Sequence, residues 1–452
     1  MKLCRISLAL AAATLAFAGT ARAQEGTPIA GALAVETFDS AWAVIDRTLW
    51  DTTFNGVDWD AVREELRPRA QSARTYQELR SVLGEMVGRL GLSHFGIIPG
   101  DVQDRLAAGG AAPAGGAPGD AGLELRLVGE RFLVTRVAPG GAAAAAGVRP
   151  GWAVDAVEGR PAREVLALVD RVPTAREPRA RQLAAWAALS AALRGRAGER
   201  LRVRFEDGAG RAVEKALVLG PAAGTATKVG NLPELAVRAE HERLRLDDGT
   251  SVGVIRFNYW MPVVARRLDE AVDALRDADG IVIDLRGNLG GVGVMAAGFA
   301  GHFLDRADTL GTMRMRQGPL HFVVNPRRVD ARSRPARPFA GPVAILVDAL
   351  SVSTSEIFAG GLRRLGRARV FGETTAGQAL PSYARRLPNG DVLQHAVADF
   401  TGPGGERFEG AGVAPDVAAP PTREALLAGG DPALDAAVRW IREERARGRA
   451  PR

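Results

Sequence analysis

The sequence predicts an α/β protein whose core is a mostly parallel β-sheet with helices on both faces. Two apolar runs, 280–285 and 343–347, have the composition of buried strands, and 251–257 alternates like a further strand. Helical patterns at 268–275 and after Gly290 lie between these strands. Strands that alternate with helices are typical of a parallel sheet covered on both faces. With 452 residues, the chain is long enough for two or three domains.

The chain begins with the pattern of a secretory signal peptide, residues 1–23. Lys2 and Arg5 precede an apolar run that ends in a small-residue cleavage motif, so we expect cleavage after Ala23. The single cysteine, Cys4, would leave with this segment, and the mature protein would hold no disulfide. No later apolar run is long enough for a membrane span, so no stable membrane anchor is expected. The predicted location is therefore the periplasm or the outside of the cell.

Charge and motif content argue against nucleic acid, metal and cofactor. The formal net charge is +7, and loss of the signal segment with Lys2, Arg5 and Arg22 lowers it to +4. The remaining arginines are scattered among acidic residues and form no basic stripe. No pair of histidines has the spacing of metal ligands, and no nucleotide-binding loop is present. No pattern indicates an oligomeric state.

The segments that flank the parallel core are expected to fold separately. Trp42, Ile45 and Leu49 recur at helical spacing near the N-terminus, and a run of Ala, Gly and Pro follows later. The expected order is signal peptide 1–23, N-terminal helical region 24–105, linker 106–119, a compact mainly β unit 120–221, core 222–425 and C-terminal helix 426–452.

A serine-rich turn follows the buried strand 343–347. Ser351, Ser353 and Ser355 come directly after the strand and before a helical pattern. A serine at such a turn exposes its hydroxyl, and the helix N-terminus favours the negative charge that develops near it. The commoner role of serines before a helix is to cap it. The segment alone therefore leaves capping and nucleophilic catalysis open.

Four motifs in fixed order resemble the C-terminal processing (tail-specific) serine protease superfamily. They are Asp-Leu-Arg-Gly-Asn-Leu-Gly-Gly at 284–291, Ser-Val-Ser-Thr-Ser-Glu at 351–356, Gly-Glu-Thr-Thr-Ala-Gly at 372–377 and Gly-Val-Ala-Pro-Asp at 412–416. The resemblance covers about residues 36 to 420. It implies a crotonase-like or Clp-protease-like sheet core with an N-terminal helical cap. It also implies that Ser353, the middle serine of its motif, is the nucleophile.

The sequence departs from the serine–lysine dyad used by well-known members of that family. Gln378 stands where the family lysine would be, and a glutamine amide cannot act as a proton acceptor at ordinary pH. The chain has three lysines, which are Lys2 in the signal segment, Lys215 in the compact unit and Lys228 after it. A different base is therefore needed if the protein is an enzyme.

The pair Ser93-His94 resembles the Ser-His pair of the tricorn protease branch of the same superfamily. That resemblance implies His94 as the general base, with Ser93 and Glu409 orienting it. An imidazole has an ordinary pKa near 6.5, so activity is expected to fall as the pH drops through about 6 to 7. The alternatives are a structural histidine at a helix end for His94 and a solvated loop acid for Glu409.

An oxyanion hole should lie beside the nucleophile. The N–H of Thr354, the residue after Ser353, is expected to be the first donor. The resemblance implies that the second donor comes from the glycine pair and is Gly290, although Gly290 and Gly291 could serve only as a tight turn. Asp284 is expected to form a structural ion pair at its strand end.

The unit 120–221 resembles a PDZ domain. Gly122, Leu123, Glu124 and Leu125 stand where that family has its carboxylate-binding loop. This implies capture of peptide or protein substrates through their C-terminal tails, although Glu124 would disfavour an anionic tail. The alternative is a domain retained only for packing.

These patterns together predict an exported serine endopeptidase that cleaves peptides or unstructured protein tails. The loss of the family lysine motivates one alternative, a non-catalytic binding protein that retains the fold. A second alternative is a PDZ-based adaptor whose large domain is only a scaffold.

Overall fold

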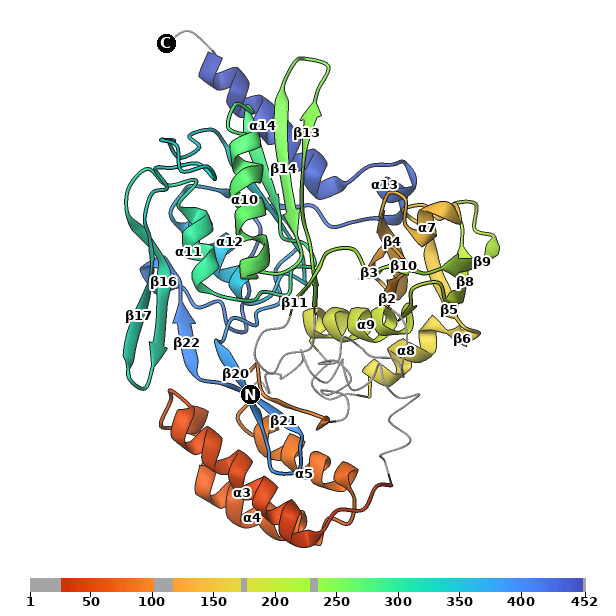
Figure 1. Ribbon diagram of the computed structural model, residues 1–452, viewed down its shortest axis with the longest axis vertical. Coiled ribbons are helices and arrows are strands. Elements are labelled where there is room, and N and C mark those ends of the chain that lie inside the picture. The colour runs from red at the N-terminus through yellow and green to blue at the C-terminus, as the bar shows by residue number, and fades with distance from the viewer. Residues whose placement is uncertain (1–25, 101–116, 172–176, 228–234, 450–452) are drawn as a thin grey trace.

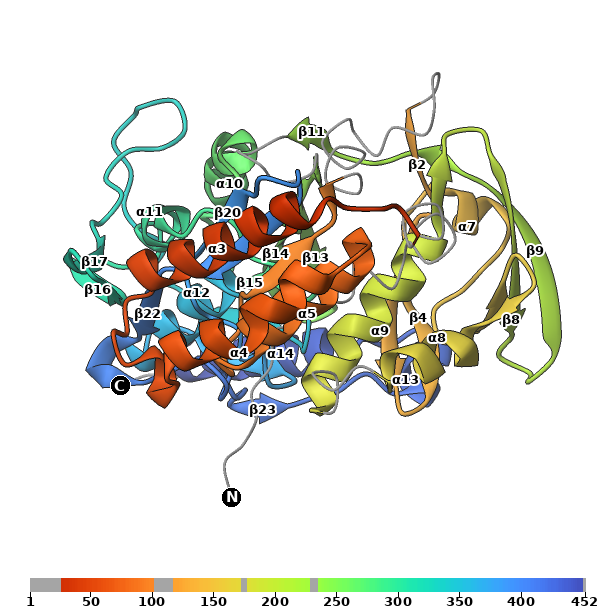
Figure 2. The ribbon, with the colours of Figure 1, turned by 90° about the horizontal axis from the view of Figure 1, so that it is seen from below.

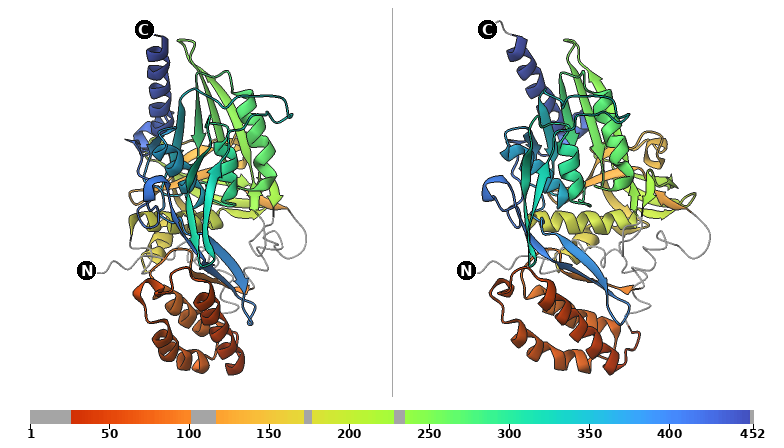
Figure 3. Two further views of the ribbon diagram at one scale, coloured as in Figure 1. Left: turned by 90° about the vertical axis from the view of Figure 1, so that its left-hand side faces the viewer. Right: turned by 60° about the vertical axis from the view of Figure 1, so that its left-hand side comes forward.

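The computed structural model describes residues 26–100, 117–171, 177–227 and 235–449. The expected signal peptide lies outside the described residues, as does most of the expected linker. A helical bundle forms one end of the molecule and the sheet core the other, while the unit from 118 to 221 lies at the side of the core (Figures 1 and 3). No helix in the described ranges is long and apolar enough to cross a membrane.

The core contains a six-stranded sheet in the order β13-β14-β15-β18-β19-β23. β13 is antiparallel to β14, and every other neighbouring pair is parallel. This confirms the predicted α/β class with a mostly parallel sheet. The strands are β13 (Ala239–Arg245), β14 (Ser251–Phe257), β15 (Gly280–Asp284), β18 (Val343–Val347), β19 (Arg369–Gly372) and β23 (Val417–Ala418).

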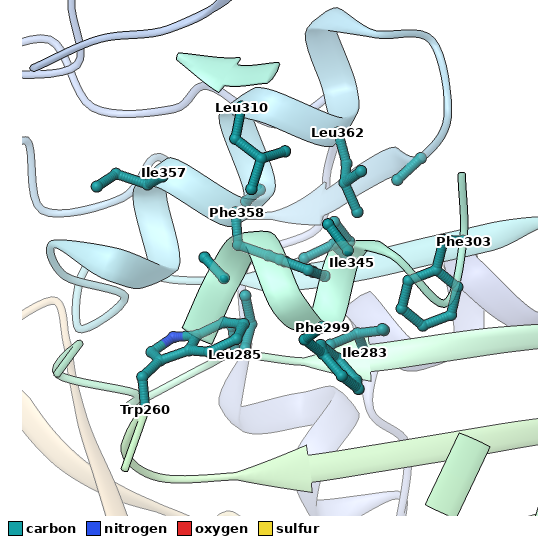
Figure 4. Close-up of a cluster of buried hydrophobic side chains, with 14 of the residues drawn as sticks. Trp260, Ile283, Leu285, Phe299, Phe303, Leu310, Ile345, Ile357, Phe358 and Leu362 are labelled. Carbon is teal, nitrogen blue, oxygen red and sulfur yellow. The ribbon is translucent and has the colours of Figure 1, made fainter. Parts of the chain in front are cut away.

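Helices cover both faces of this sheet because successive strand side chains point to opposite faces. On one face, Ile283 and Ile345 pack with Trp260, Phe299 and Phe358 in a fully buried cluster (Figure 4). On the other face, a smaller apolar cluster packs against the C-terminal helix. The helices are α10 (Pro262–Ala274), α11 (Val294–Ala300) and α12 (Thr354–Arg364) on the first face, and α14 (Pro432–Arg449) on the second.

Smaller sheets extend the core. One has the order β17-β16-β22, a second β1-β21-β20, and β11 pairs with β12. The second sheet joins the core to the N-terminal bundle. The elements are β1 (Gly96–Ile98), β11 (Thr225–Thr227), β12 (Leu235–Val237), β16 (Asp308–Met315), β17 (Gly318–Val324), β20 (Ser382–Arg386), β21 (Val392–Ala396), β22 (Ala398–Thr401) and the short helix η3 (Pro403–Gly405).

The N-terminal bundle consists of α3 (Gly31–Thr48), α4 (Trp59–Ser72) and α5 (Tyr76–Gly88), with the short helix η1 (Phe54–Gly56) between α3 and α4. Asp58 and Thr75 cap α4 and α5 by accepting main-chain N–H groups of the first turn. The apolar faces of the helices bury Leu380 and Leu393 of the β20–β21 segment. Arg80 also pairs at 2.7 Å with Asp391, whose carboxylate is buried. These contacts fix the chain that leads from α5 through His94 into β1.

The unit at the side of the core is built on the sheet β3-β4-β5-β8-β9, to which β6 is added, and on the small sheet β10-β2-β7. Figure 2 shows α8 and α9 of this unit next to its strands, with α9 on the side of the core. The expected linker boundary is wrong by two residues, because 118 and 119 pair within β2. The elements are β2 (Pro118–Asp120), β3 (Leu123–Val128), β4 (Arg131–Val137), α7 (Ala142–Ala145), β5 (Ala153–Val157), β6 (Arg160–Pro161), α8 (Ala162–Val169), α9 (Pro178–Ala192), β7 (Arg194–Arg196), β8 (Arg200–Glu206), β9 (Ala212–Val218) and β10 (Gly220–Pro221), and α13 (Arg423–Leu427) lies against the unit.

The hydrophobic core of this unit continues into the sheet core. Leu350, Val352 and Ala376, which flank the serine-rich turn and the following motif, are buried among its side chains. Arg126 of β3 forms a buried ion pair with Asp348 at 2.6 Å. The unit therefore packs directly on the segment that carries Ser353.

Candidate active site

Ser353 lies at the turn between β18 and α12 and differs from its two neighbouring serines. The Ser351 hydroxyl donates to the Leu285 carbonyl at 2.8 Å, and the Ser355 hydroxyl accepts the Trp260 indole N–H at 3.0 Å. Both residues are fully buried, whereas Ser353 is partly exposed. Only the Ser353 hydroxyl is therefore available to a substrate.

The main chain at Ser353 adopts φ 57°, which is rare for a residue with a Cβ atom. Such strain persists only where the surroundings enforce it, and it costs on the order of 1–3 kcal/mol. The Ser353 N–H donates to Glu356 Oε2 and to the Gln378 carbonyl, each at 3.0 Å. These bonds hold the turn in the conformation that presents the hydroxyl.

Glu356 organises the loops around Ser353. Its fully buried carboxylate accepts four hydrogen bonds, from the Thr375 hydroxyl and from the N–H groups of Ser353, Gly377 and Gln378. Burial raises the pKa of Glu356 to about 7, although these donors act in the opposite direction. Glu356 therefore ties the nucleophile turn to the loop that contains Gln378.

The structure brings His94, Ser93 and Glu409 together. Ser93 Oγ lies 2.8 Å from His94 Nδ1 and 3.0 Å from Glu409 Oε2. The Ser93 N–H also donates to Glu409 Oε1 at 3.1 Å. Ser93 and Glu409 are separated by more than 300 positions in the chain, and the β1–β21 pairing together with the bundle brings them into contact.

This arrangement selects one tautomer of His94. A carboxylate can only accept hydrogen bonds, so the Ser93 hydroxyl donates to Glu409 and its oxygen accepts from His94 Nδ1–H. The lone pair of the imidazole is then on Nε2. A neutral imidazole with a free Nε2 lone pair is the form that can take a proton from a serine hydroxyl.

The two halves of the site are joined through the main chain of Gln378 and Ala379. The Gln378 carbonyl accepts the Ser353 N–H, and the Ala379 N–H donates to Glu409 Oε2 at 3.0 Å. No hydrogen bond joins Ser353 Oγ to His94 in the described part of the chain. Catalytic hydrogen bonds in free enzymes are often long and shorten when substrate binds.

Burial changes the proton affinity of these groups. It lowers the pKa of His94 to about 4, because the imidazolium would lose most of its hydration. Burial also raises the pKa of Glu409, although hydrogen bonds from Ala379 and Ser93 oppose this. The range of pH 6 to 7 applies to an imidazole before its surroundings shift the pKa, so burial moves the expected loss of activity to a more acidic range.

The oxyanion site differs in one donor from the expectation. The Thr354 N–H has no acceptor among the described residues, as expected for the first residue of a helix. The Gly290 N–H, in contrast, donates to Asn288 Oδ1 at 3.0 Å. The neighbouring N–H of Gly291 has no acceptor in the described ranges, and the Gly291 carbonyl accepts from the Thr354 hydroxyl. Gly291 therefore replaces Gly290 as the candidate for the second donor.

Gly290 has a steric role beside Ser353. A Cβ atom at Gly290 would lie 2.8 Å from Ser353 Cβ and 2.9 Å from the Val352 carbonyl oxygen, and φ at Gly290 is +89°. Gly290→Ala should therefore displace the nucleophile turn. We expect kcat/KM to fall on the order of 10²-fold or more, the size of a lost oxyanion donor. The value of kcat/KM for cleavage of a short fluorogenic peptide measures this loss.

Gly298→Ala is the matched control for Gly290→Ala. Gly298 lies in α11, and a Cβ there would meet no atom within 4 Å. This variant should keep wild-type activity. Equal activity of both variants would show that the Gly290 main chain does not constrain Ser353.

The lysines of the chain do not provide a base in the described structure. Lys215 lies on β9, with its Nζ 5.9 Å from the centre of the Trp152 ring. Lys228 lies outside the described residues. Gln378, at the place of the family lysine, is buried, and its side-chain Oε1 has no hydrogen-bond partner.

The loop 122–125 is arranged differently from an open carboxylate site. The Gly122 N–H already donates to Asp120 Oδ1 at 2.6 Å, and Leu123 and Leu125 belong to β3. Burial raises the pKa of Glu124, but neighbouring arginines outweigh this and hold the pKa below its ordinary value. Arg136 and Arg238 pair with it at 3.1 and 3.0 Å. The charge of Glu124 is therefore balanced by arginines, but a tail carboxylate would compete with Asp120 for the Gly122 N–H.

A charged cavity separates this loop from the sheet core. The cavity has a volume of about 350 Å³, and Glu124, Arg126, Asp284 and Arg286 are among its lining residues. Asp284 pairs with Arg286 at 2.8 Å and with Arg256 at 2.9 Å, which fits the expected structural ion pair. Ser353 and His94 do not line the cavity. In the described ranges, no group of three His, Cys, Asp or Glu side chains could hold a metal ion.

Three residues of the site were not identified from the sequence. Glu356 was part of a quoted motif but was given no role, although its place at the third helical position after Ser353 is that of a capping-box acid. Asp348 accepts hydrogen bonds from the N–H groups of Gly287 and Leu350 and from the Arg126 guanidinium. It therefore connects the glycine-rich segment 284–291 and the serine-rich turn to β3. Arg179, whose guanidinium donates to the main-chain carbonyls of Thr375, Gly410 and Ala411, lies in no motif of the sequence.

Comparisons with known proteins identify two domains of the chain and its relatives. Residues 251–419 match the sequence profile of peptidase family S41, and residues 35–88 match the tricorn protease C1 domain. Carboxyl-terminal-processing peptidase 2 of Arabidopsis thaliana chloroplasts is 26% identical over 396 residues, which cover 84% of this chain and 67% of the relative. The carboxyl-terminal-processing protease of a Picosynechococcus strain is 24% identical, covering 84% of this chain and 82% of the relative.

Solved structures show the same fold. The photosystem II D1 C-terminal processing protease aligns with a TM-score of 0.55 at 22% identity, over 90% of this chain and 97% of that one. Mature CPAF aligns with a TM-score of 0.60 at 13% identity, over 93% and 99%. The fold and the matched domains define a serine-type peptidase. The chain therefore contains a peptidase family S41 domain and a tricorn protease C1 domain, and its relatives are named carboxyl-terminal-processing proteases.

Proposed function

We propose that the protein cleaves peptide bonds by acyl transfer to Ser353, with His94 as general base. The observation that carries this proposal is the Glu409–Ser93–His94 chain of hydrogen bonds, which leaves the His94 Nε2 lone pair free. A nucleophile needs an adjacent base, and the base needs a group that orients it. Ser93 and Glu409 are the orienting groups.

The reaction then proceeds in two halves. Ser353 Oγ attacks the scissile carbonyl carbon while its proton moves to His94 Nε2, and the N–H groups of Thr354 and Gly291 stabilise the oxyanion. His94 returns the proton to the leaving amine as the C–N bond breaks. Water hydrolyses the acyl-enzyme in the second half, with His94 again taking the proton.

A fluorophosphonate probe tests this function directly. It should attach to Ser353 of the wild-type protein, which peptide mapping by mass spectrometry would locate. Absence of labelling on folded protein, together with absence of peptide cleavage, would instead favour a non-catalytic binding protein that retains the fold.

We also propose that the substrates are tails of exported proteins. The relatives are named for carboxyl-terminal processing, and the sequence begins with a signal-peptide pattern, which supports a periplasmic or secreted location. The PDZ-like unit 120–221 would bind the tail through the segment 122–125 and β3. Its position on the nucleophile turn is consistent with delivery of a bound tail to Ser353.

The carboxylate of the tail provides a test of this recruitment. A long peptide with a free C-terminus should have a KM several-fold lower than the same peptide with a C-terminal amide, because a carboxylate offers the loop N–H groups two charged acceptor oxygens and an amide only one neutral oxygen. A short fluorogenic peptide, with and without the amide, is the control. Equal KM values for both long peptides would contradict tail capture and favour a packing role for the unit.

A further inference from the structure

Arg179 links the PDZ-like unit to two loops of the catalytic core. It lies in the first turn of α9, and its guanidinium donates to three main-chain carbonyls of the core. Nη1 donates to Thr375 at 3.0 Å and to Ala411 at 2.8 Å, while Nη2 donates to Gly410 at 3.0 Å. Nε donates to Glu177 Oε1 at 3.0 Å, which fixes the orientation of the guanidinium plane.

The two loops held by Arg179 carry the groups that connect Ser353 to His94. Thr375 begins the loop that leads to Gln378 and Ala379, and Gly410 directly follows Glu409. The loops are also bonded to each other, because the Gly410 N–H donates to the Gly377 carbonyl at 2.8 Å. A shift of either loop would therefore move Glu409 relative to Ser93.

The chain leaves room for the guanidinium between these loops. A Cβ atom at Gly412 would lie 2.7 Å from Arg179 Nη1, and one at Gly377 would lie 3.2 Å from it. The side chain is only 21% exposed. A planar guanidinium can serve three carbonyls at fixed directions, which the single ammonium of a lysine cannot reproduce.

We propose that Arg179 is a positioning residue for catalysis, acting through Glu409. It holds the Gly410–Ala411 main chain against the loop of Thr375, so that Glu409 keeps Ser93 and His94 in the orientation that leaves Nε2 free. Because Arg179 belongs to α9, the PDZ-like unit completes the catalytic site. This inference rests on the proposed Ser353–His94 mechanism.

The test compares Arg179→Ala and Arg179→Lys with Arg181→Ala in the full-length protein. Arg181 lies two residues further along α9 and pairs with Asp170 and Glu130 at 2.6 and 2.8 Å, outside the core. For a short peptide, Arg179→Ala should lower kcat on the order of 10- to 10²-fold with little change in KM, since a small misplacement of catalytic groups has effects of this size. Arg179→Lys should recover only part of the loss, and Arg181→Ala should behave as wild type.

Two further measurements separate positioning from a purely structural role. The rate of fluorophosphonate labelling per folded molecule should fall in Arg179→Ala along with kcat, and added guanidinium ion at millimolar concentration should restore part of both. Wild-type kcat and labelling in Arg179→Ala would overturn the proposal. So would a loss that only follows the folded fraction and does not respond to guanidinium. Full activity of His94→Ala would instead overturn the mechanism itself, whereas an inactive His94→Ala beside a fully active Arg179→Ala would refute only the role of Arg179.

Discussion

Ser353→Ala is expected to abolish both peptide cleavage and fluorophosphonate labelling. Ser353 is the partly exposed serine of the turn, whereas the hydroxyls of Ser351 and Ser355 are engaged in buried hydrogen bonds. Removal of a serine nucleophile lowers kcat by roughly 10⁴- to 10⁶-fold, since nucleophile and base act as a unit. Steady-state cleavage of a short peptide and gel detection of the labelled protein measure this loss.

Ser355→Ala is the control for Ser353→Ala. It removes the acceptor of the buried Trp260 indole N–H, which should lower the free energy of unfolding by about 1–3 kcal/mol. Labelling per folded molecule should stay near the wild-type rate. Persistent labelling of Ser353→Ala, combined with its loss in Ser355→Ala, would assign the nucleophile to Ser355 and contradict the geometry of the turn.

His94→Ala is expected to be nearly as damaging as Ser353→Ala, because a nucleophile and its base act as a unit. His321→Ala is the matched control, since His321 is exposed and its Nδ1 lies 2.9 Å from the Thr312 hydroxyl oxygen. Gln378→Lys should not restore His94→Ala, because the loop has been arranged around Glu356 and Glu409 and not around a lysine. Substantial activity of His94→Ala that is lost on changing Lys215 would refute the histidine mechanism.

The pH dependence gives an independent measurement on the same group. The neutral imidazole is the active form, and burial lowers the pKa of His94 to about 4. Activity should therefore be retained between pH 6 and 7 and be lost as the pH falls toward 4, below the 6.5 of an ordinary imidazole. The raised pKa of Glu409 adds a second protonation, at a pH above that of an ordinary carboxyl group.

The profile of kcat/KM against pH for a short peptide reports these ionisations in the free enzyme. The rates must be taken per folded molecule, because burial also lowers the pKa of His395 to about 4. A histidine with a depressed pKa in the folded state reduces stability as the pH falls below its unfolded value. An acid limb at pH 6.5 or above would indicate a solvated His94 and contradict the buried site.

The sequence determined the strands and helices of the core and the identity of most reactive side chains. Apolar runs such as Val343–Val347 have the composition of buried strands, and the local pattern of the serine-rich turn indicates its position before a helix but leaves capping and catalysis open. The choice among Ser351, Ser353 and Ser355 needed either the family resemblance or the structure, because all three have the same local context.

Only the tertiary structure decided how these side chains work together. Ser93 and Glu409 are distant in the chain, and their contact depends on the β1–β21 pairing and on the packing of the bundle. The pKa of His94 depends on burial, and the engaged N–H of Gly290 depends on where Asn288 points. The contacts of Arg179 depend on how α9 packs on the core. Local patterns determine the secondary structure and the reactive side chains of a segment, whereas desolvation and long-range hydrogen bonds arise only when distant segments pack together.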